Sequence, residues 1–416
     1  MRLGVYADMR YRADVNGVSS HHSFLRFLTA LPPRVEELVF FGRPDPDPGR
    51  SPYDLAPPCV RFVPLLHYKR GTPLGPPPHS LGRVLAAFAP ELDRIDALWA
   101  FGPDPVALAL ALMARRRGTP VALGVRQDYP SYVRHHLPNK RWIWVLPVAH
   151  ALERSFRALA RSSPTIAVGE DLAARYRGGR APVLATGFCT VSRSDVVSSE
   201  TALAKPWAGE LRLLSVGRVD HEKNPLLLVD VIAGLHARNP AWRLEVVGDG
   251  PLRPALEERI RARRLDGVVK FHGRVPNGPR LWAVYRRCHA FLHTSLTEGL
   301  PHVVFEAQAA GLPLVATAIG GVPAALDGGR SGMLVPPKAA APAIAALERL
   351  AADGDLRQRL IEVGLANAAS NTMEAQLDRI ATFLRENAVR GEPARRATVS
   401  RASVAKDARG ARSSHR

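Results

Sequence analysis

The residues best suited to chemistry stand near position 300, where two glutamates surround the start of a predicted helix. Glu298 lies just before that helix, and Glu306 lies about a turn and a half into it. The backbone N–H groups of Leu300, His302 and Val303 should be free, because the first turn of a helix has no intrahelical partners for them. Such a terminus binds anions, above all phosphate. One carboxylate can therefore lie beside the phosphates of a ligand and the other further along the same ligand.

A short strand and a tight turn must position this group. Residues 290–292 form an apolar run with the length and character of a buried strand. Pro301 suits the first helical turn, since its missing N–H costs nothing there, and Gly299 permits close approach of the backbone to a ligand. Glutamates near a helix start are also favoured by the helix dipole alone, so a solvated pair is the alternative interpretation.

A second predicted strand end, after residues 211–216, carries two basic residues. Gly217 turns the chain, Arg218 follows it, and Lys223 comes five residues later. A diphosphate bound at such a strand end requires its negative charge to be stabilised. Arg, Lys and helix N-termini can supply this stabilisation without a metal. As an isolated pair, the two residues would simply be a solvated loop.

Both elements resemble motifs of the family 4 retaining glycosyltransferases. Glu298 and Glu306, with seven residues between them, resemble the E-x7-E element, and Arg218 and Lys223 have the spacing of the GR-x4-K element. The resemblance implies that Glu306 holds the ribose hydroxyls of the donor and that Glu298 lies near the transferred sugar. It also implies that Arg218 and Lys223 contact the diphosphate, which makes these two residues and Glu298 catalytic candidates.

Other positions resemble the family pattern less closely. Gly17 resembles the glycine that lets the first strand–helix loop approach the donor phosphates, although Asn16 stands where many members have a second glycine. Gly248 lies in a turn like the one after the family's second strand, and Arg274 lies where the backbone meets the base. The donor-binding set that the resemblance implies is Gly17, Arg218, Lys223, Gly248, Arg274, Glu298, Gly299, Leu300, Pro301, His302 and Glu306.

Departures from the family pattern bear on the acceptor and on fine donor contacts. Many members place a histidine after the strand that corresponds to residues 121–125, close to the reacting sugar, whereas this chain has Gln127 and Asp128. Asp128 is our candidate for that polar catalytic role. Ala324 and Lys338 stand where the family commonly has an acidic residue.

The chain of 416 residues suggests two domains, and the order of its elements predicts their class. Strands and helices alternate in both halves, which argues for parallel sheets covered by helices, with ligands beyond the carboxyl ends of the strands. The resemblance implies a GT-B fold, an α/β fold of two doubly wound Rossmann-like domains that face each other across a cleft. We expect an acceptor domain at 1–191, a linker at 192–208, a nucleotide-sugar-binding domain at 209–370, a helix at 371–386 that returns to the first domain, and a disordered basic tail at 387–416.

Cysteine content and the distribution of apolar residues indicate the cell compartment and the possible binding partners. The three cysteines lie far apart, without a C-x-x-C motif or a Cys/His cluster, so we expect no metal site and a reducing compartment. No apolar run reaches the ~20 residues of a membrane-spanning helix, and the N-terminus reads as a strand rather than a signal peptide. We therefore expect a cytoplasmic protein. Nothing resembles a motif that reads DNA or RNA, so nucleic acid is not an expected partner.

The net charge of +19 points to polyanions or anionic lipid as partners. Lys140, Arg141, Trp142 and Trp144 interleave basic and aromatic residues, as is typical of a membrane interface. A core helix with a basic flank is the alternative. The inner face of the cell membrane is therefore a candidate location.

Together these features predict a metal-independent retaining glycosyltransferase of the hexosyltransferase class. It would move a sugar from a nucleotide-diphosphate sugar to a lipid-linked or saccharide acceptor, with no other cofactor. Two alternatives stay open: a catalytically inactive glycosyltransferase-like binding subunit, and a nucleotide-sugar epimerase or hydrolase on the same fold. The intact Glu298, Glu306, Arg218 and Lys223 argue against the first. The products formed from a nucleotide sugar without acceptor would distinguish the second alternative from a glycosyltransferase.

Overall fold

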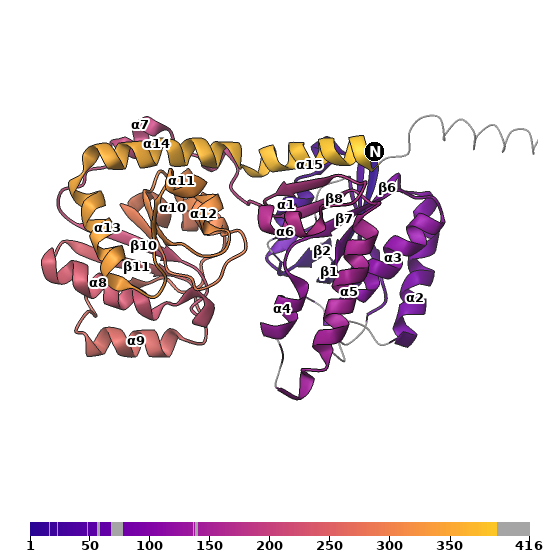
Figure 1. Cartoon of the computed structure of the whole chain (residues 1–416), viewed down its shortest axis with the longest axis horizontal. Coiled ribbons are helices and arrows are strands. Elements are labelled where there is room, and N and C mark those ends of the chain that lie inside the picture. The colour runs from indigo at the N-terminus through magenta and orange to yellow at the C-terminus, as the bar shows by residue number, and fades with distance from the viewer. Residues whose placement is uncertain are drawn as a thin grey trace, which may run out of the picture. The chain divides into compact units, whose positions relative to one another are not determined.

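The protein forms two compact α/β units in a computed structural model that describes residues 1–388 apart from 16, 23, 48, 56–58, 68–77, 136, 138 and 139 (Figure 1). The first unit comprises Met1–Thr186 and the chain from Leu377 onward, and the second comprises Gly187–Gln376. Each unit has its own sheet and its own hydrophobic core. The predicted α/β class with parallel sheets is confirmed.

The central sheet of the first unit is parallel. Its strands run in the spatial order β5-β3-β1-β6-β7-β8-β9. Their bounds are β1 Arg2–Asp14, β3 Glu37–Pro44, β5 Val60–Pro64, β6 Ala97–Gly102, β7 Val121–Val125, β8 Thr165–Val168 and β9 Val183–Thr186. The central strands β6 and β7 are almost continuously apolar and buried, as expected where helices cover both faces of a parallel sheet.

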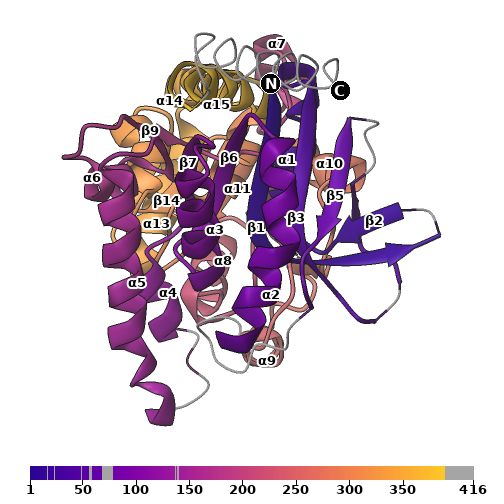
Figure 2. The same ribbon diagram turned by 90° about the vertical axis from the view of Figure 1, so that its right-hand side faces the viewer.

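The first strand is longer than its apolar start indicates. The segment 8–17, expected to form a loop after the first strand, continues β1 to Asp14 and then turns back into β2 (Gly17–Ser20), which pairs antiparallel with β1. A short strand β4 (Tyr53–Asp54) pairs with β2, and Figure 2 shows this hairpin at one side of the parallel sheet. Buried Met9 and Tyr11 alternate with exposed or half-buried arginines, which is the period of a strand.

The helices of the first unit fill the connections between its parallel strands. They are α1 Phe24–Thr29, α2 Pro78–Phe88, α3 Pro105–Arg116, α4 Tyr129–His135, α5 Val145–Ala160 and α6 Glu170–Tyr176. α3 begins after Asp104, whose side chain accepts hydrogen bonds from the backbone N–H groups of Val106 and Ala107. The buried side of α3 packs against β1, β6 and β7.

The sheet of the second unit changes direction beside its first strand. The spatial order is β12-β11-β10-β13-β14-β15, and these strands pair in parallel. Their bounds are β10 Leu211–Val216, β11 Trp242–Val247, β12 Val269–Phe271, β13 Ala290–His293, β14 Leu314–Thr317 and β15 Met333–Val335. The chain fills one side of β10 first and then moves to the other side with β13. In open α/β sheets, ligands bind at the carboxyl ends of the strands at such a reversal.

The helices of the second unit enclose this sheet. They are α7 Ser199–Leu203, α8 Leu226–Arg238, α9 Arg253–Ala262, α10 Pro279–Arg287, α11 His302–Ala309, α12 Val322–Ala325, α13 Ala340–Ala352 and α14 Gly354–Ser370. One core cluster joins α8 and α13 to the sheet through buried leucines, valines and Trp242. A second cluster joins α10 and α11 to the sheet and includes Tyr285 and Phe291. In the part of the chain that is described, every helix is too short or too polar to cross a bilayer.

The boundary between the units lies earlier than the linker expected at 192–208. The second unit begins at Gly187, and Val191 and Ala202 are buried within it because their apolar side chains pack against its helices. α15 (Met373–Asn387) begins in the second unit and continues in the first, where Arg34 pairs with Asp378 at 2.6 Å. The expected tail lies, from residue 389 on, outside the described residues.

Candidate active site

Three of the predicted catalytic residues meet in the second unit. Arg218 follows β10, Lys223 ends the short helix η5 (His221–Lys223), and Glu298 lies between β13 and α11. Because β10 and β13 are adjacent parallel strands, the loops that leave their carboxyl ends share one edge of the sheet. Residues that stand 75 positions apart, Lys223 and Glu298, are therefore in direct contact.

The helix after Glu298 begins where the sequence predicts. Pro301 is its N-cap residue with an extended backbone, and His302 is the first helical residue. The N–H group of Val304 already bonds the carbonyl of Pro301 at 3.2 Å. The N–H groups of the preceding residues of this first turn are the ones available to an anion.

Glycines leave the loop before this helix open on one side and packed on the other. A Cβ added to Gly299 would meet open space, so a ligand can approach the backbone there. A Cβ added to Gly320 would lie 2.0 Å from the carbonyl oxygen of Glu298, and the φ of Gly320 is +48°. Gly320 and Gly321 thus hold the backbone of this loop at a distance that a larger residue would not permit.

Glu298 is a carboxylate that is 11% exposed and held by three hydrogen-bond donors. Its Oε1 accepts hydrogen bonds from Nζ of Lys223, from Nε2 of His293 at 3.0 Å and from Oγ of Ser295 at 2.9 Å. Burial by itself raises the pKa, but the His293 hydrogen bond and the Lys223 charge outweigh it and lower the pKa of Glu298 to about 2. Glu298 is therefore ionised at neutral pH, where it can stabilise positive charge but cannot donate a proton.

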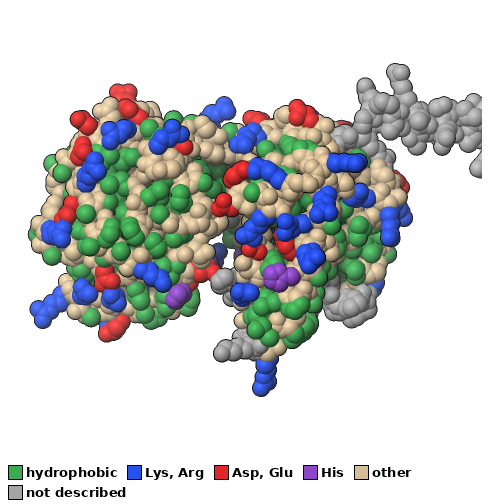
Figure 3. Space-filling model, viewed as in Figure 1, with side chains coloured by type: hydrophobic (Ala, Val, Ile, Leu, Met, Phe, Trp, Pro, Cys, Tyr) green, Lys and Arg blue, Asp and Glu red, His purple; other side chains and the backbone are tan. Residues whose placement is uncertain are grey.

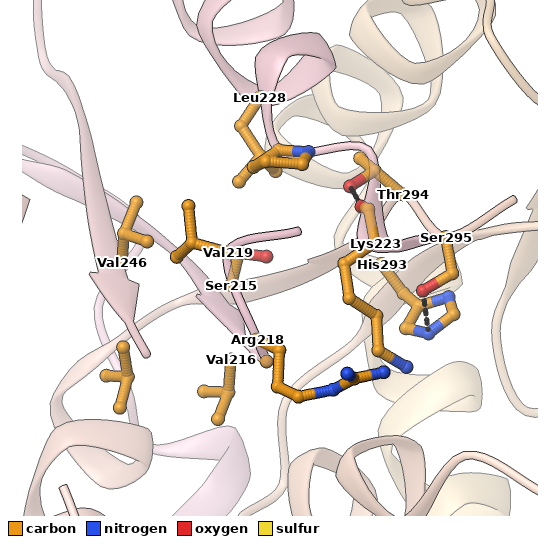
Figure 4. Close-up of a pocket in the computed structure, with 13 residues that line it drawn as sticks. Ser215, Val216, Arg218, Val219, Lys223, Leu228, Val246, His293, Thr294 and Ser295 are labelled. Carbon is orange, nitrogen blue, oxygen red and sulfur yellow. Dashed lines mark hydrogen bonds between the residues drawn. The ribbon is translucent and has the colours of Figure 1, made fainter. Parts of the chain in front are cut away.

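Both basic residues are neutralised by carboxylates of the same unit. Arg218, whose side chain is 64% exposed, pairs with Asp220 at 2.9 Å and with Glu222 at 2.8 Å, while Lys223 pairs with Glu298. Figure 4 shows the charged ends of Arg218 and Lys223 side by side at a pocket that Ser215, Thr294 and Ser295 also line. An anionic ligand at this pocket must compete with these carboxylates for the two cations.

Gly248 acts through packing of the loop that carries Arg218. It lies in the turn after β11 with a φ of +140°, and a Cβ there would lie 1.8 Å from the carbonyl oxygen of Gly217. Its N–H group bonds the carbonyl of Gly273 at 2.8 Å. Only glycine permits this approach, so Gly248 positions the start of the Arg218 loop. Arg274, which follows Gly273, is exposed.

Glu306 lies in the second turn of α11 and is only 6% exposed. The hydroxyl of Tyr285 donates to its Oε2 at 2.7 Å, and Nδ2 of Asn277 donates to its Oε1 at 3.2 Å. Burial and the charge of Glu306 raise the pKa of Tyr285 well above its usual value, so this hydroxyl keeps its proton and remains a donor. Both oxygens of the carboxylate thus face hydrogen-bond donors.

Two predicted site residues belong to the first unit instead. The expectation that Gly17 lies in a strand–helix loop is wrong, because the chain after β1 continues as a hairpin in which Gly17 is the exposed first residue of β2, with a φ of +126°. Asp128 follows β7 and pairs with Arg175 of α6 at 2.5 Å. Burial raises its pKa, but bonds from Arg175 and Ser131 outweigh burial and lower it. Asp128 is therefore an ionised acceptor.

Apart from Lys223, sequence reasoning does not single out the side chains that donate to the two glutamates. Tyr285 lies on the buried side of α10, where a tyrosine reads as part of the core. His293 and Ser295 lie two positions apart at the end of β13, and side chains two apart in an extended chain point to the same side. That spacing was the available signal for a pair of donors aimed at Glu298.

Comparison with known proteins finds a family model that is similar to most of the second unit. Residues 204–366 match the family model of glycosyl transferases group 1. A D-inositol 3-phosphate glycosyltransferase from Arthrobacter sp. (strain FB24) is 39% identical over 132 residues, which cover 31% of this chain and 31% of that protein. A GDP-mannose-dependent alpha-mannosyltransferase from Mycobacterium tuberculosis (strain CDC 1551 / Oshkosh) is 28% identical over 348 residues, which cover 81% of this chain and 84% of that protein.

The length of the likeness differs between these proteins. The chain spans about a third of the Arthrobacter relative's length and most of the mycobacterial one. Among solved structures, Alr3699/HepE of Anabaena in complex with UDP has a TM-score of 0.68 at 16% identity, covering 93% of this chain and 100% of that chain. At this identity the likeness concerns the fold alone, and it confirms the predicted class of two Rossmann-like domains.

Proposed function

We propose that the protein is a retaining glycosyltransferase, because residues 204–366 match the family model of glycosyl transferases group 1. It takes a sugar from a nucleotide-diphosphate donor and passes it to a lipid-linked or saccharide acceptor. The observation that carries the proposal is the meeting of Arg218, Lys223 and Glu298 at the start of α11. Retention of the anomeric configuration rests on the likeness of Glu298 and Glu306 to the E-x7-E element.

The donor would lie along the edge of the second sheet. Its diphosphate would contact Arg218, Lys223 and the first turn of α11, which supply positive charge where negative charge develops as the bond to the sugar breaks. The ribose hydroxyls would reach Glu306 on the side of Oε1, in exchange for the hydrogen bond from Asn277. The base would then lie toward the exposed segment around Arg274.

Lys223 would exchange one anionic partner, Glu298, for another, the diphosphate. Before a diphosphate arrives, its ammonium group holds Glu298. When the diphosphate takes Lys223, Glu298 keeps His293 and Ser295 as donors and stays ionised. A carboxylate fixed beside the transferred sugar stabilises the positive charge that develops at the anomeric carbon. The acceptor oxygen then bonds to that carbon as the bond from the carbon to the diphosphate breaks, and the hydroxyl proton passes to the departing phosphate oxygen.

We propose that this chemistry needs no metal ion and no other cofactor. Two cations and a helix N-terminus stand where a metal would otherwise neutralise the diphosphate. Transfer should therefore continue in the presence of a chelator. Strict dependence on added magnesium or manganese would count against this part of the proposal.

A screen of nucleotide sugars followed by product analysis tests the function. The correct donor should raise the melting temperature, because a ligand that binds only the folded state stabilises it. That donor is then incubated with and without lipid-linked and saccharide acceptors, and the product's anomeric configuration is read by NMR. Transfer with retention is the expected result. An epimer or rapid release of free sugar without acceptor would favour the alternative enzymes, and absence of turnover with every donor would favour a binding subunit.

An exposed patch on the first unit supports work at the inner face of the cell membrane. The α4–α5 patch consists of Tyr132, Arg134, Arg141, Ile143, Trp144 and Val148. Ile143 is 62% exposed and Trp144 is 54% exposed, and Trp144 stacks on Trp142 with ring centroids 5.9 Å apart. Figure 3 shows hydrophobic side chains together with Lys or Arg at this end of α5. Apolar tips among basic residues suit an anionic lipid surface, which would present a lipid-linked acceptor.

Liposome flotation tests the membrane location. The protein should float with anionic but not with neutral vesicles, lose this binding at high salt, and bind less after Ile143→Ser with Trp144→Ser. Leu112→Ser on α3 is the control, since Leu112 is 43% exposed outside the patch. If the protein stays in the bottom fraction with anionic vesicles at low salt, the acceptor is not presented by a membrane.

A further inference from the structure

Among the residues that the structure describes, no carboxylate pairs with one guanidinium group at the carboxyl ends of the strands of the first unit. Arg126 follows β7 directly and is half-buried. Within the described part of the chain, neither an ion pair nor a hydrogen bond reaches its side chain. Its guanidinium carbon lies 4.6 Å from the centroid of the Phe24 ring. The face of an aromatic ring attracts a cation, but it leaves the five N–H donors of arginine without oxygen acceptors.

The neighbouring charges are already committed to other partners. Asp8 of β1 pairs with Arg43 of β3 at 3.4 Å, and Arg43 is only 5% exposed. On the other side, Asp128 pairs with Arg175. Among the described residues, Asp8 and Asp128 are thus each paired with another guanidinium group, and no ion pair reaches Arg126.

The aromatic surroundings hold Arg126 in place and reduce its contact with water. The Phe24 ring stacks on Phe27 and meets Phe101, at the end of β6, edge to face with centroids 5.1 Å apart. Burial lowers the pKa of Arg126, yet an arginine in a protein keeps its charge. The buried hydroxyl of Tyr11 on β1, which is 1% exposed, also has no hydrogen-bond partner in the described structure. Unsatisfied buried donors of this kind cost folding free energy unless a bound molecule supplies an acceptor.

The topology places Arg126 where such sheets bind ligands. The first sheet fills one side of β1 with β3 and β5, then reverses to the other side with β6 and β7. Arg126 leaves the carboxyl end of β7, one strand beyond that reversal. The resemblance of the chain to glycosyltransferases assigns this unit to the acceptor.

We propose that Arg126 binds an oxyanionic group, a phosphate or a carboxylate, on the acceptor. The inference rests on the proposed function, since it names the substrate class of the unit that would hold the acceptor. The planar guanidinium can donate two parallel hydrogen bonds to an oxyanion while it remains stacked on Phe24. A neutral sugar hydroxyl would satisfy one donor but would not balance the charge.

The first experiment measures stability with and without inorganic phosphate. Without added anion, Arg126→Met should melt a few degrees higher than the parent, because it removes an unpaired cation and leaves no carboxylate without a partner. At constant ionic strength, phosphate should stabilise the parent more than it stabilises Arg126→Met. Arg83→Met is the control, because Arg83 is exposed on α2 and should keep the full response. Arg126→Lys keeps the charge but loses the planar guanidinium. Phosphate should stabilise it less than the parent and more than Arg126→Met.

The second experiment identifies the source of the oxyanion with the full chain. Glucose is compared with glucose 6-phosphate, acetate replaces phosphate in the stability assay, and phosphatidylcholine vesicles are compared with vesicles that also contain phosphatidylinositol. A preference of roughly 10- to 100-fold for the phosphorylated partner, lost in Arg126→Met, is expected from charge-assisted hydrogen bonds. Preference within the sugar pair indicates a soluble acceptor, preference within the vesicle pair indicates a lipid headgroup, and stabilisation by acetate alone indicates a carboxylate.

One result overturns the proposal: Arg126→Met with the same phosphate and acetate stabilisation as the parent and no gain in stability of its own. These readouts need no turnover, so they separate this inference from the proposed function. If no nucleotide sugar is ever used but the anion effect depends on Arg126, the anion site stands and the glycosyltransferase proposal fails.

Discussion

The two units differ in whether the basic side chains at the carboxyl ends of their strands are paired with carboxylates. In the second unit, Arg218 is paired with Asp220 and Glu222, and Lys223 is paired with Glu298. In the first unit, Arg126 lies on an aromatic ring and, among the described residues, no carboxylate pairs with it.

The difference indicates what each edge can bind. A cation that already has a carboxylate partner gives it up only to an anion that interacts more strongly, and a diphosphate with several charged oxygens is such an anion. A cation without a partner binds a single oxyanion with no exchange. We therefore expect the second unit to select highly charged ligands and the first unit to accept a singly placed oxyanion.

The strongest test of the paired edge is Lys223→Ala. Because the ammonium acts where the diphosphate departs, turnover should fall by roughly 100- to 1,000-fold, the range seen when one transition-state donor is removed. Binding of a nucleoside monophosphate should change much less. Steady-state kinetics and calorimetry measure the two effects, with Lys270→Ala, exposed on β12 of the same unit, as the control. An equal loss of monophosphate affinity would show that Lys223 acts in binding alone.

The next largest effect should come from Glu306. Glu306→Gln keeps the shape that Tyr285 and Asn277 surround but removes the charge, so nucleotide affinity should fall by about 1.5–3 kcal/mol, the value of a charge-assisted hydrogen bond. Glu306→Ala also leaves the buried Tyr285 hydroxyl without its acceptor and should lower the free energy of unfolding as well. Calorimetry with Glu258→Gln, an exposed control on α9, measures the affinity. Unchanged nucleotide affinity in a folded Glu306→Gln protein excludes the ribose role.

His293 tests how the second unit keeps Glu298 ionised once Lys223 is taken. The folded pKa of Glu298 is lowered from 4.5 to about 2, so its contribution to stability is fully present above about pH 4.5 and is lost as the pH falls toward 2. His293→Leu removes a donor and should raise that pKa, which moves the acid limb of the activity profile up by about one pH unit. His293→Gln keeps a nitrogen donor and should restore the limb. If both variants keep the parent's profile, His293 plays no part in holding the charge.

The smallest effect should come from the exposed pair of the first unit. The Arg175 side chain is 53% exposed and that of Asp128 is 31% exposed, so solvent screens their attraction. Arg175→Ala should lower the free energy of unfolding by less than about 1 kcal/mol, and less still at high salt. Urea unfolding at two salt concentrations measures this. A loss of several kcal/mol of unfolding free energy would mean that the site in the first unit depends on its ion pair as strongly as the site in the second unit does.

The two units also differ in how far their sequence predicts them. In the second unit, the strand before Arg218 and the start of α11 at Pro301 and His302 lie where the sequence places them. In the first unit, the loop expected after the first strand is a hairpin, and Gly17 is the first residue of its second strand. The alternation of Met9 and Tyr11 with arginines is typical of a strand. The polar residues of this segment nevertheless favoured the prediction of a loop.

The sequence by itself determined which residues stand at the strand ends, because each motif is local: an apolar run, a glycine turn and a helix start lie within a few residues. The α/β class and the resemblance to glycosyltransferases follow from such patterns. Only the tertiary structure decided which charges meet. The contact of Lys223 with Glu298, the donors Tyr285 and Asn277 at Glu306, and the unpaired state of Arg126 depend on which strands are neighbours. Strand order is set by packing between distant segments, and hydrophobic periodicity along the chain does not predict it.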